Sequence, residues 1–472
     1  MLRPLAALIV LVFACSAEEP KKPSPAGLWL GKLKACPTEL RLALQIEQQN
    51  TTQVAFAGKM ISLDQGRIEI QCESVTCDRD GKIDIKIPSI DGTFAGTLDE
   101  EKKTIVGEFV QGGNKYPLTL DRVEKLPAPN RPQHPKSPYP YTVEEVKFEN
   151  AAAKISLAGT LTLPKGDGPF AAVVLVTGSG PQDRDETIME HKPFLVLADH
   201  LTRAGIAVLR YDDRGVAKSG GKFAGSTSAD FATDAYAAVK FLQGRKEIDP
   251  KRIGICGHSE GGMIAPMVAA EHPNEVGFIV LLAGPGESGG TIIKTQNLDS
   301  ARTNKATEGE LKMLAGLFDE IIPLVASDRS TDTLKTDIRA KVQECAKQLA
   351  DDSKRKELAA NLEIMAEAFS DPWMRYFLAH DPATPLKKVK CPVLALNGAK
   401  DIQVRSKENL AGIAAALKAG GNAKFTSREF PELNHLFQSC NTGAVAEYGK
   451  IEETFNPEAL KAVSEWIAGL GK

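Results

Sequence analysis

Hydrophobic and polar positions change their pattern near residue 141, which divides the chain into two regions. After this point, short apolar runs alternate with amphipathic segments of helical period, such as residues 230–243 and 457–470. The apolar runs are residues 171–177, 206–211, 252–256, 276–283, 391–397 and 423–430. Apolar strands that alternate with helices are typical of a parallel sheet covered on both faces. We therefore predict an α/β domain over residues 142–472 that begins with an antiparallel hairpin.

The alternation stops between residues 290 and 386, where the pattern is helical throughout. Thr307 and Glu310 have the spacing of a capping box, and Leu311, Leu314 and Phe318 follow at helical intervals. Because ligands of such sheets bind outside the carboxyl ends of the strands, we expect this helical insertion to form a lid over that edge.

Residues 25–125 alternate with a period of two instead. One face of a strand would carry Leu40, Leu42, Leu44 and Ile46, and another would carry Ile83, Ile85 and Ile87. About eight short strands fit a small all-β domain, either an antiparallel barrel or a sandwich. No convergent set of polar residues marks a ligand site in this region, so we favour a stabilising or spacer domain over a binding module.

The remaining segments connect or target these domains. Residues 126–141 are proline-rich and predict a semi-rigid linker. Residues 1–17 have the arginine, the apolar stretch and the small residues of a signal peptide, and residues 18–24 form a polar tether. The sequence VFAC, which ends at Cys15, resembles a lipobox, although ordinary signal cleavage nearby is the alternative. We expect an exported protein, secreted, periplasmic or lipid-anchored to the envelope, that contacts membrane only through such an anchor.

Composition and charge argue against two classes of function, namely nucleic-acid binding and zinc chemistry. The chain of 472 residues has a net charge of −3, with lysine and arginine spread along it, which gives no reason to expect a nucleic-acid partner. Cys72 and Cys77 could form a disulfide in an oxidising compartment, whereas Cys256 and Cys391 lie in apolar strand patterns. No cysteine and histidine spacing indicates zinc, and we expect neither a metal nor an organic cofactor.

Candidate chemistry begins with Ser259 in the sequence GHSEGG, at a predicted junction of strand and helix. The pattern G-x-S-x-G is weak evidence by itself, since small residues are common. Gly257 and Gly261 would leave room for a strained turn that exposes the serine hydroxyl at the edge of the sheet. A serine hydroxyl is a poor nucleophile, so the hypothesis requires a base and an acid elsewhere.

His435 is the best candidate for the base among the seven histidines, because it follows the last predicted strand directly. His258 adjoins the serine, and we expect the turn to direct it away. Asp401 lies in the loop after the strand of residues 391–397 and is the candidate acid. The order serine, acid, histidine is that of α/β-hydrolases. The alternatives without a catalytic role are that His435 is a surface residue and that Asp401 only stabilises a turn.

An oxyanion hole requires two N–H donors. The backbone N–H of Glu260, directly after the serine, is the first candidate. The glycine-rich loop after residues 171–177 supplies the second, for which we favour the backbone N–H of Ser179.

Six motifs together resemble the α/β-hydrolase superfamily and, within it, bacterial secreted or lipoprotein carboxylesterases of the EstD type. In chain order they are GSGPQDRDE, YDDRGVAKSGG, GHSEGG, DPWMRYFLAHDP, NGAKD and LNHLF. The resemblance covers residues 142–470, and the β-rich region before it resembles the N-terminal domain of some of these enzymes. Ala217 stands where the family usually has glycine. The resemblance implies Ser259 as nucleophile, Asp401 and His435 as its partners, and hydrolysis of a small ester substrate.

Three functions therefore have to be separated. We favour a serine carboxylesterase that acts through an acyl-enzyme intermediate. A serine aminopeptidase or a thioesterase would use the same residues, and a catalytically inert envelope-binding protein is the alternative of another class. Trp373 and Phe377 are unusually apolar for a segment that leaves a lid, and we consider both an acyl pocket and a purely structural role for them.

Overall fold

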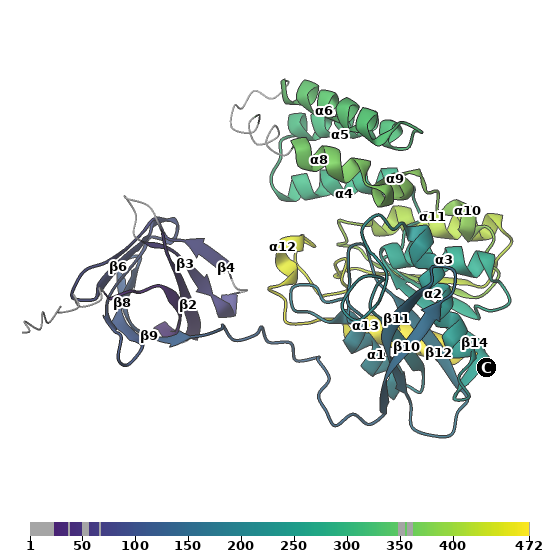
Figure 1. The fold of residues 1–472 in the computed structure, drawn as a ribbon, viewed down its shortest axis with the longest axis horizontal. Coiled ribbons are helices and arrows are strands. Elements are labelled where there is room, and N and C mark those ends of the chain that lie inside the picture. Colours follow the sequence, from purple (N-terminus) through teal and green to yellow (C-terminus); the bar gives the residue numbers. More distant parts are fainter. Residues whose placement is uncertain are drawn as a thin grey trace, which may run out of the picture. The chain divides into compact units, whose positions relative to one another are not determined.

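The computed structural model describes residues 23–35, 38–49, 56–65, 68–347, 355 and 362–471. The predicted signal peptide and Cys15 lie outside these residues and stay predictions. The chain divides into two compact units, Met1–Ala128 and Pro129–Lys472, drawn in Figure 1 as separate bodies. No helix of the described ranges is long and apolar enough to cross a membrane.

The first unit is an antiparallel barrel, which confirms the all-β prediction. Its strands are β1 (Gly27–Ala35), β2 (Thr38–Gln48), β3 (Phe56–Ser62), β4 (Ile68–Gln71), β5 (Ser74–Cys77), β6 (Lys82–Ile87), β7 (Gly92–Asp99), β8 (Thr104–Gln111) and β9 (Asn114–Val123). Pairing runs around the ring from β1 through β9, β8, β7, β6, β5 and β3 to β2, which pairs again with β1. β4 adds to β3 outside the ring. A sandwich is thereby excluded, because a closed ring has no second sheet.

The interior of the barrel comes from alternate positions of these strands. Leu42, Leu44 and Ile46 of β2 face the core together with Ile83, Ile85 and Ile87 of β6, as the period of two predicts. Trp29, at 0% exposure, lies among them. Cys72 and Cys77 are both free thiols, so the disulfide considered above is not formed. Cys72 packs on the barrel core, whereas the Cys77 thiol donates toward the carbonyl of Asp78.

The second unit is built on an eight-stranded sheet in the order β10-β11-β13-β12-β14-β15-β16-β17. The strands are β10 (Thr142–Asn150), β11 (Ile155–Leu163), β12 (Phe170–Val176), β13 (Ala207–Tyr211), β14 (Ile248–His258), β15 (Phe278–Leu282), β16 (Val393–Gly398) and β17 (Phe425–Phe430). β10 and β11 form the expected hairpin, and the strands from β13 to β17 are parallel. The carboxyl ends of the parallel strands therefore lie at one edge.

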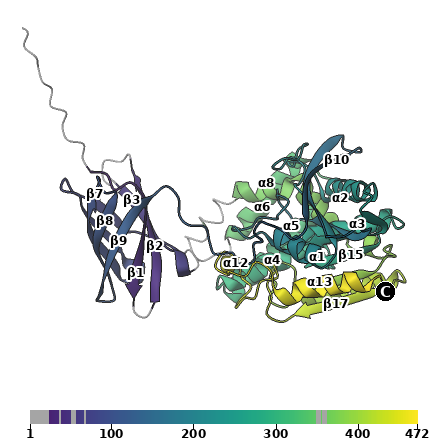
Figure 2. The same cartoon turned by 90° about the horizontal axis from the view of Figure 1, so that it is seen from below.

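Helices cover both faces of this sheet, and the strands send alternate residues to each. Val173 and Leu175 pack with α1 (Pro193–Arg203) and α13 (Pro457–Gly469). Val174 and Val176 pack on the other face with α2 (Ser228–Gln243), α3 (Glu260–Glu271) and α11 (Ser406–Ala419). Figure 2 shows α13 and β17 along one side of the unit and α2 and α3 on the other. Two short helices, α10 (Ala383–Leu386) and α12 (Val445–Tyr448), complete this α/β part.

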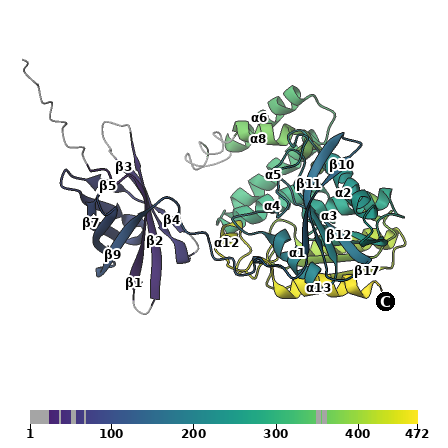
Figure 3. The ribbon, with the colours of Figure 1, turned by 60° about the horizontal axis from the view of Figure 1, so that its bottom comes forward.

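The predicted lid is helical, as expected. It comprises α4 (Gly289–Thr303), α5 (Glu308–Val325), α6 (Thr331–Lys347), α8 (Leu362–Ser370) and α9 (Pro372–Ala379). The capping box of Thr307 and Glu310 opens α5. The lid has its own apolar core, which includes Phe318, Ile321 and Phe377 and reaches Met263 of α3. Figure 3 shows the lid helices gathered beyond one end of the sheet.

Part of the proline-rich segment belongs to the second unit, which begins at Pro129. The Arg131 guanidinium donates to the carbonyl oxygens of Met189, Gly449 and Ile451. The Gln133 amide accepts from the backbone N–H groups of residues 454 and 455 and donates to the carbonyl of residue 455. These bonds hold residues 131–133 against the segment 449–455.

Candidate active site

Ser259 lies between the last residue of β14 and the first residue of α3. Its φ of 52° and ψ of −114° are strained for a residue with a side chain. Such strain persists only where the surrounding structure enforces it, and it is concentrated at functional sites. The chain thus forms a sharp strand-to-helix turn at this serine, and the side chain is neither fully buried nor fully exposed.

Two glycines permit this turn. A Cβ atom on Gly257 would lie 1.9 Å from the carbonyl oxygen of Gly261. A Cβ atom on Gly261 would lie 2.1 Å from the carbonyl oxygen of Val176 in β12. Since both contacts are with backbone, which cannot move aside cheaply, larger residues would displace the turn from the sheet.

Asp401 and His435 come together from loops that follow β16 and β17. The Nδ1 atom of His435 lies 2.7 Å from Oδ2 of Asp401, and both residues are 4% exposed. The other carboxylate oxygen accepts from the backbone N–H groups of Gln403 and Val404, which fixes its orientation. With Nδ1 bound to the carboxylate, Nε2 of His435 has no hydrogen-bond partner among the described residues.

The loop after β12 passes close to the serine. A Cβ atom on Gly178 would lie 3.2 Å from Cβ of Ser259. The backbone N–H of Gly178 donates to Oε1 of Glu186 at 2.7 Å. The backbone N–H groups of Ser179 and Glu260 donate to no acceptor within the described ranges. The two N–H groups expected from the sequence as oxyanion donors are therefore not engaged within the described residues, and their role stays a prediction.

Two of the six motifs, GSGPQDRDE and YDDRGVAKSGG, hold this loop in place through their acidic and basic side chains. Both carboxylate oxygens of Asp213 accept bonds from it, one from the Thr177 hydroxyl and one from the backbone N–H of Gln182. Asp212 binds the Arg184 guanidinium through two oxygens. Burial raises the pKa of Asp213 to about 8. The motifs YDDRG and GSGPQDRDE thus hold each other in place.

Glu260 links the elbow to the lid. Its carboxylate oxygen accepts from the Ser228 hydroxyl at 2.5 Å and from the Trp373 indole N–H at 2.7 Å. Burial raises the pKa of Glu260. Trp373 also stacks on Phe377 with 5.3 Å between ring centroids. One edge of Trp373 is therefore occupied by the residue after the serine, a contact across 113 positions that no local pattern indicates.

Glu186 and His258 have no role among those predicted from the sequence. The structure buries both, with Nδ1 of His258 lying 2.9 Å from Oε1 of Glu186 and Nε2 lying 2.9 Å from the carbonyl oxygen of His435. The motif GSGPQDRDE, which ends at Glu186, was the available signal. The other histidines lie elsewhere. His191 binds residues 448 and 454, and His200 binds Ser464.

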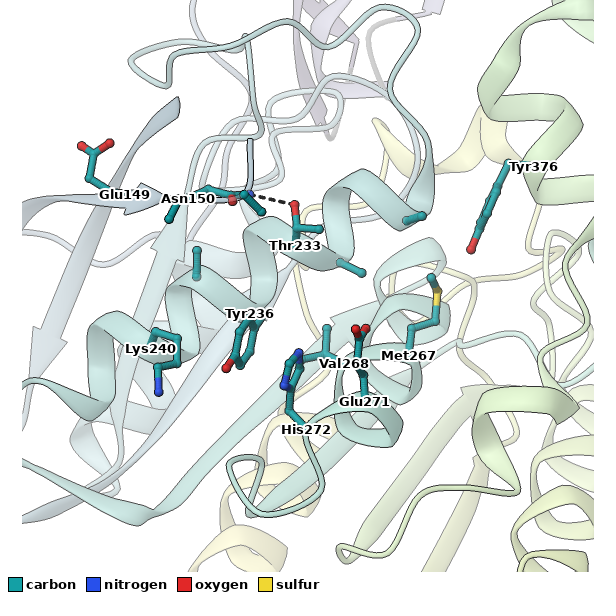
Figure 4. Close-up of a pocket in the computed structure, with 15 residues that line it drawn as sticks. Glu149, Asn150, Thr233, Tyr236, Lys240, Met267, Val268, Glu271, His272 and Tyr376 are labelled. Carbon is teal, nitrogen blue, oxygen red and sulfur yellow. Dashed lines mark hydrogen bonds between the residues drawn. The ribbon is translucent and has the colours of Figure 1, made fainter. Parts of the chain in front are cut away.

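A large cavity of about 710 Å³ lies away from these residues, between α2, α3 and the turn after β10. In Figure 4 its wall carries Tyr236 and His272, whose rings stack 3.5 Å apart, and Tyr376 of α9. None of the candidate site residues lines it. In the described part of the chain, no group of three or more histidine, cysteine, aspartate or glutamate side chains could hold a metal ion.

Several known proteins resemble this chain. Residues 189–438 match the family described as "Serine aminopeptidase, S33". The esterase EstD of Thermotoga maritima is 30% identical over 338 residues, which cover 70% of this chain and 71% of that protein. Among solved structures, the esterase Pf2001 of Pyrococcus furiosus is 17% identical with a TM-score of 0.44, over 70% of this chain and 91% of that one. Est1E of Butyrivibrio proteoclasticus is 15% identical with a TM-score of 0.39, over 69% and 98%. The chain belongs to the serine aminopeptidase S33 family of α/β-hydrolases.

Proposed function

We propose that this protein is a serine carboxylesterase that hydrolyses small esters through an acyl-enzyme intermediate. The observation that carries the proposal is the strained Ser259 at the strand end together with the bond between His435 and Asp401. The 30% identity to an esterase over most of its length supports the ester as substrate class.

Each residue has one role in the proposed mechanism. Ser259 attacks the ester carbonyl while Nε2 of His435 accepts its proton. Asp401 holds His435 in the tautomer that carries the proton on Nδ1 and stabilises the imidazolium that forms. The backbone N–H groups of Glu260 and Ser179 stabilise the oxyanion. His435 then gives its proton to the departing alcohol and activates the water that releases the acid.

An aminopeptidase is the second candidate, because the family takes its name from such enzymes. It would require a carboxylate free to bind the ammonium group of a peptide. The buried acids around the elbow are engaged already. Glu186 binds His258, Asp213 binds Thr177, and Glu260 binds Trp373. This occupancy favours a neutral acyl substrate over a free amino terminus.

The test compares hydrolysis of p-nitrophenyl esters, thioesters and aminoacyl-p-nitroanilides by the full chain. We expect turnover of short esters and a loss of at least about 10³-fold in Ser259→Ala, since the nucleophile is removed. Ser300→Ala, which changes an exposed serine on α4, is the matched control and should remain fully active. Faster turnover of anilides than of esters would make the protein an aminopeptidase, and a fully active Ser259→Ala would exclude this serine.

A further inference from the structure

A second buried pair of histidine and carboxylate lies beside the pair of His435 and Asp401. Glu186 is 1% exposed and His258 is 5% exposed, and they join at 2.9 Å. The rings of His258 and His435 lie 4.8 Å apart between centroids. The proposed mechanism does not use this second pair.

The hydrogen-bond partners define the protonation state of His258. One ring nitrogen faces a carboxylate oxygen and the other faces a backbone carbonyl oxygen, and both of these groups only accept. With Glu186 ionised, both ring nitrogens therefore carry hydrogen and the ring is an imidazolium. Burial alone would lower the pKa of His258, but the charge and hydrogen bond of Glu186 and the carbonyl of His435 raise it.

Glu186 and His258 are bonded to three of the segments that carry a proposed functional group. The Oε1 atom of Glu186 accepts from Gly178 in the oxyanion loop and from His258, which precedes Ser259. His258 in turn donates to the carbonyl of His435 in the base loop. The backbone of Glu186 has a φ of 53°, an unfavourable conformation for a glutamate. The strained backbone indicates that surrounding contacts hold this carboxylate in its place.

We propose that Glu186 and His258 form a positioning pair that sets the relative places of the oxyanion loop, the nucleophile and the base. The inference rests on the proposed function, because the three loops matter together only if Ser259 is acylated. One ionised pair then joins three segments that follow different strands. Glu186 also occupies the Gly178 N–H, so this group is not a donor for the oxyanion.

The consequence is a specific pH dependence. The titratable groups around the pair are Asp401 and His435 from the two loops of the acid and base, Cys256 from β14, and Asp213 from the loop after β13. Replacing Glu186 by glutamine keeps an oxygen that accepts but removes the charge that favours the imidazolium. At high pH, His258 would then lose one proton and one of its two bonds. At low pH it would regain both.

The experiment measures the rate at which a fluorophosphonate labels Ser259 in the full chain, at pH values from about 6 to about 8.5. We expect Glu186→Gln to be labelled about 100-fold more slowly than wild type at the upper end, the scale of a misplacement of about 1 Å. The deficit should shrink towards the lower end. Near-ultraviolet circular dichroism checks that the variant is folded.

His258→Gln disrupts the same pair from the other side. Because the two residues act as one unit, the double variant should be labelled within about threefold of the slower single variant. Asp199→Asn is the control for loss of a carboxylate. This substitution on α1 changes the carboxylate that accepts from Tyr141 and Arg203. The variant should be labelled at the wild-type rate.

The outcomes separate this inference from the proposed function. A folded Glu186→Gln that is labelled at the wild-type rate, or that is slowed equally at every pH, would overturn the positioning pair, as would fully additive losses. If the wild type is labelled but hydrolyses no ester, the carboxylesterase proposal fails while the labelling rates still decide the role of the pair. A wild type that is not labelled would overturn both.

Discussion

The barrel and the α/β unit differ in the number of ionisable side chains that they bury. Within the described residues of the barrel, the buried polar side chain is that of Ser62, and the interior is otherwise hydrocarbon and aromatic. The α/β unit buries ionisable groups at and near the carboxyl edge of its sheet, namely Glu186, His191, Arg210, Asp212, Asp213, Arg214, Asp234, His258, Glu260, Asp401 and His435. Burying a charge costs free energy unless it is paired. Within the described residues, the α/β unit thus buries many ionisable groups and the barrel interior none, and the proposed acid and base, Asp401 and His435, belong to this buried set.

The largest effect should come from the acid and the base. We expect Asp401→Asn to lower kcat by about 10⁴-fold, because the amide cannot hold His435 in the required tautomer. His435→Ala should do at least as much damage. Steady-state kinetics of both variants and of the double variant provide the measurement. A double variant much slower than the worse single would show that the two residues do not act as one unit.

The next largest effect should come from Trp373, whose hydrogen bond to Glu260 and stacking on Phe377 can be separated by mutation. Trp373→Phe keeps a ring to stack on Phe377 but leaves the buried Glu260 without the indole N–H. We expect kcat/KM to fall by about 10-fold, because the loss leaves a buried hydrogen-bond acceptor with one partner fewer. Tyr376→Phe, on the same helix but lining the α2–α3 cavity, is the control and should be unchanged.

A pocket role for Trp373 or Phe377 would be visible in the acyl-length profile. If either ring limits the acyl chain, its replacement by alanine should shift preference from acetyl towards octanoyl esters by about 1–3 kcal/mol per group. Lower stability with the same profile would leave only the structural role.

Removal of the barrel tests whether it contributes to chemistry. Residues 129–472 should hydrolyse small esters within about twofold of the full chain, because the proposed catalytic groups all lie after the boundary. Residues 142–472 lack Arg131 and Gln133 and should melt several degrees lower. Arg131→Ala and Gln133→Ala in the full chain should reproduce that loss in part. An inactive but folded 129–472 would mean that the barrel completes the site.

Stability against pH should also differ between the two units. The pKa of Asp213, about 8 in the folded chain, lies well above its unfolded value near 4. The folded state therefore retains this proton between these limits. The group's contribution to stability is complete below about pH 4 and is lost as the pH rises through about 8. Calorimetry should show that the melting temperature of the α/β unit falls as the pH rises over this range, while that of the barrel stays constant. The fall should be smaller in Asp213→Asn. An equal dependence of the two melting temperatures on pH would contradict this difference between the α/β unit and the barrel.

The smallest effect concerns Ala217, in the loop after β13. Its φ of 44° is left-handed, and an alanine is strained there. Ala217→Gly should therefore stabilise the α/β unit by about 0.5–1 kcal/mol. Ala232→Gly, inside α2, should instead destabilise it by about 1 kcal/mol. Thermal melts of both variants compare the two sites, and a destabilised Ala217→Gly would show that the loop tolerates the alanine without strain.

The sequence by itself determined the features that depend on neighbouring residues or on the order of residues along the chain. The alternation of apolar runs and amphipathic segments predicted the sheet and its covering helices, because each element is encoded by its own period. The capping box at Thr307 was predicted for the same reason. The candidates Ser259, Asp401 and His435 followed from their order along the chain and from their places after strands. The structure brings Asp401 to His435, while the roles of these residues stay proposals.

Only the tertiary structure decided which distant groups meet. Closure of the barrel depends on pairing β1 with both β2 and β9, and period alone fits a sandwich equally well. The bonds from Glu186 to His258 and from Trp373 to Glu260 join positions 72 and 113 residues apart. No period or spacing encodes such contacts, since they arise when loops from different strands reach the same edge of the sheet. The hydrogen-bond partners of the buried ionisable groups around Ser259 are therefore set by the tertiary fold and are visible only in three dimensions.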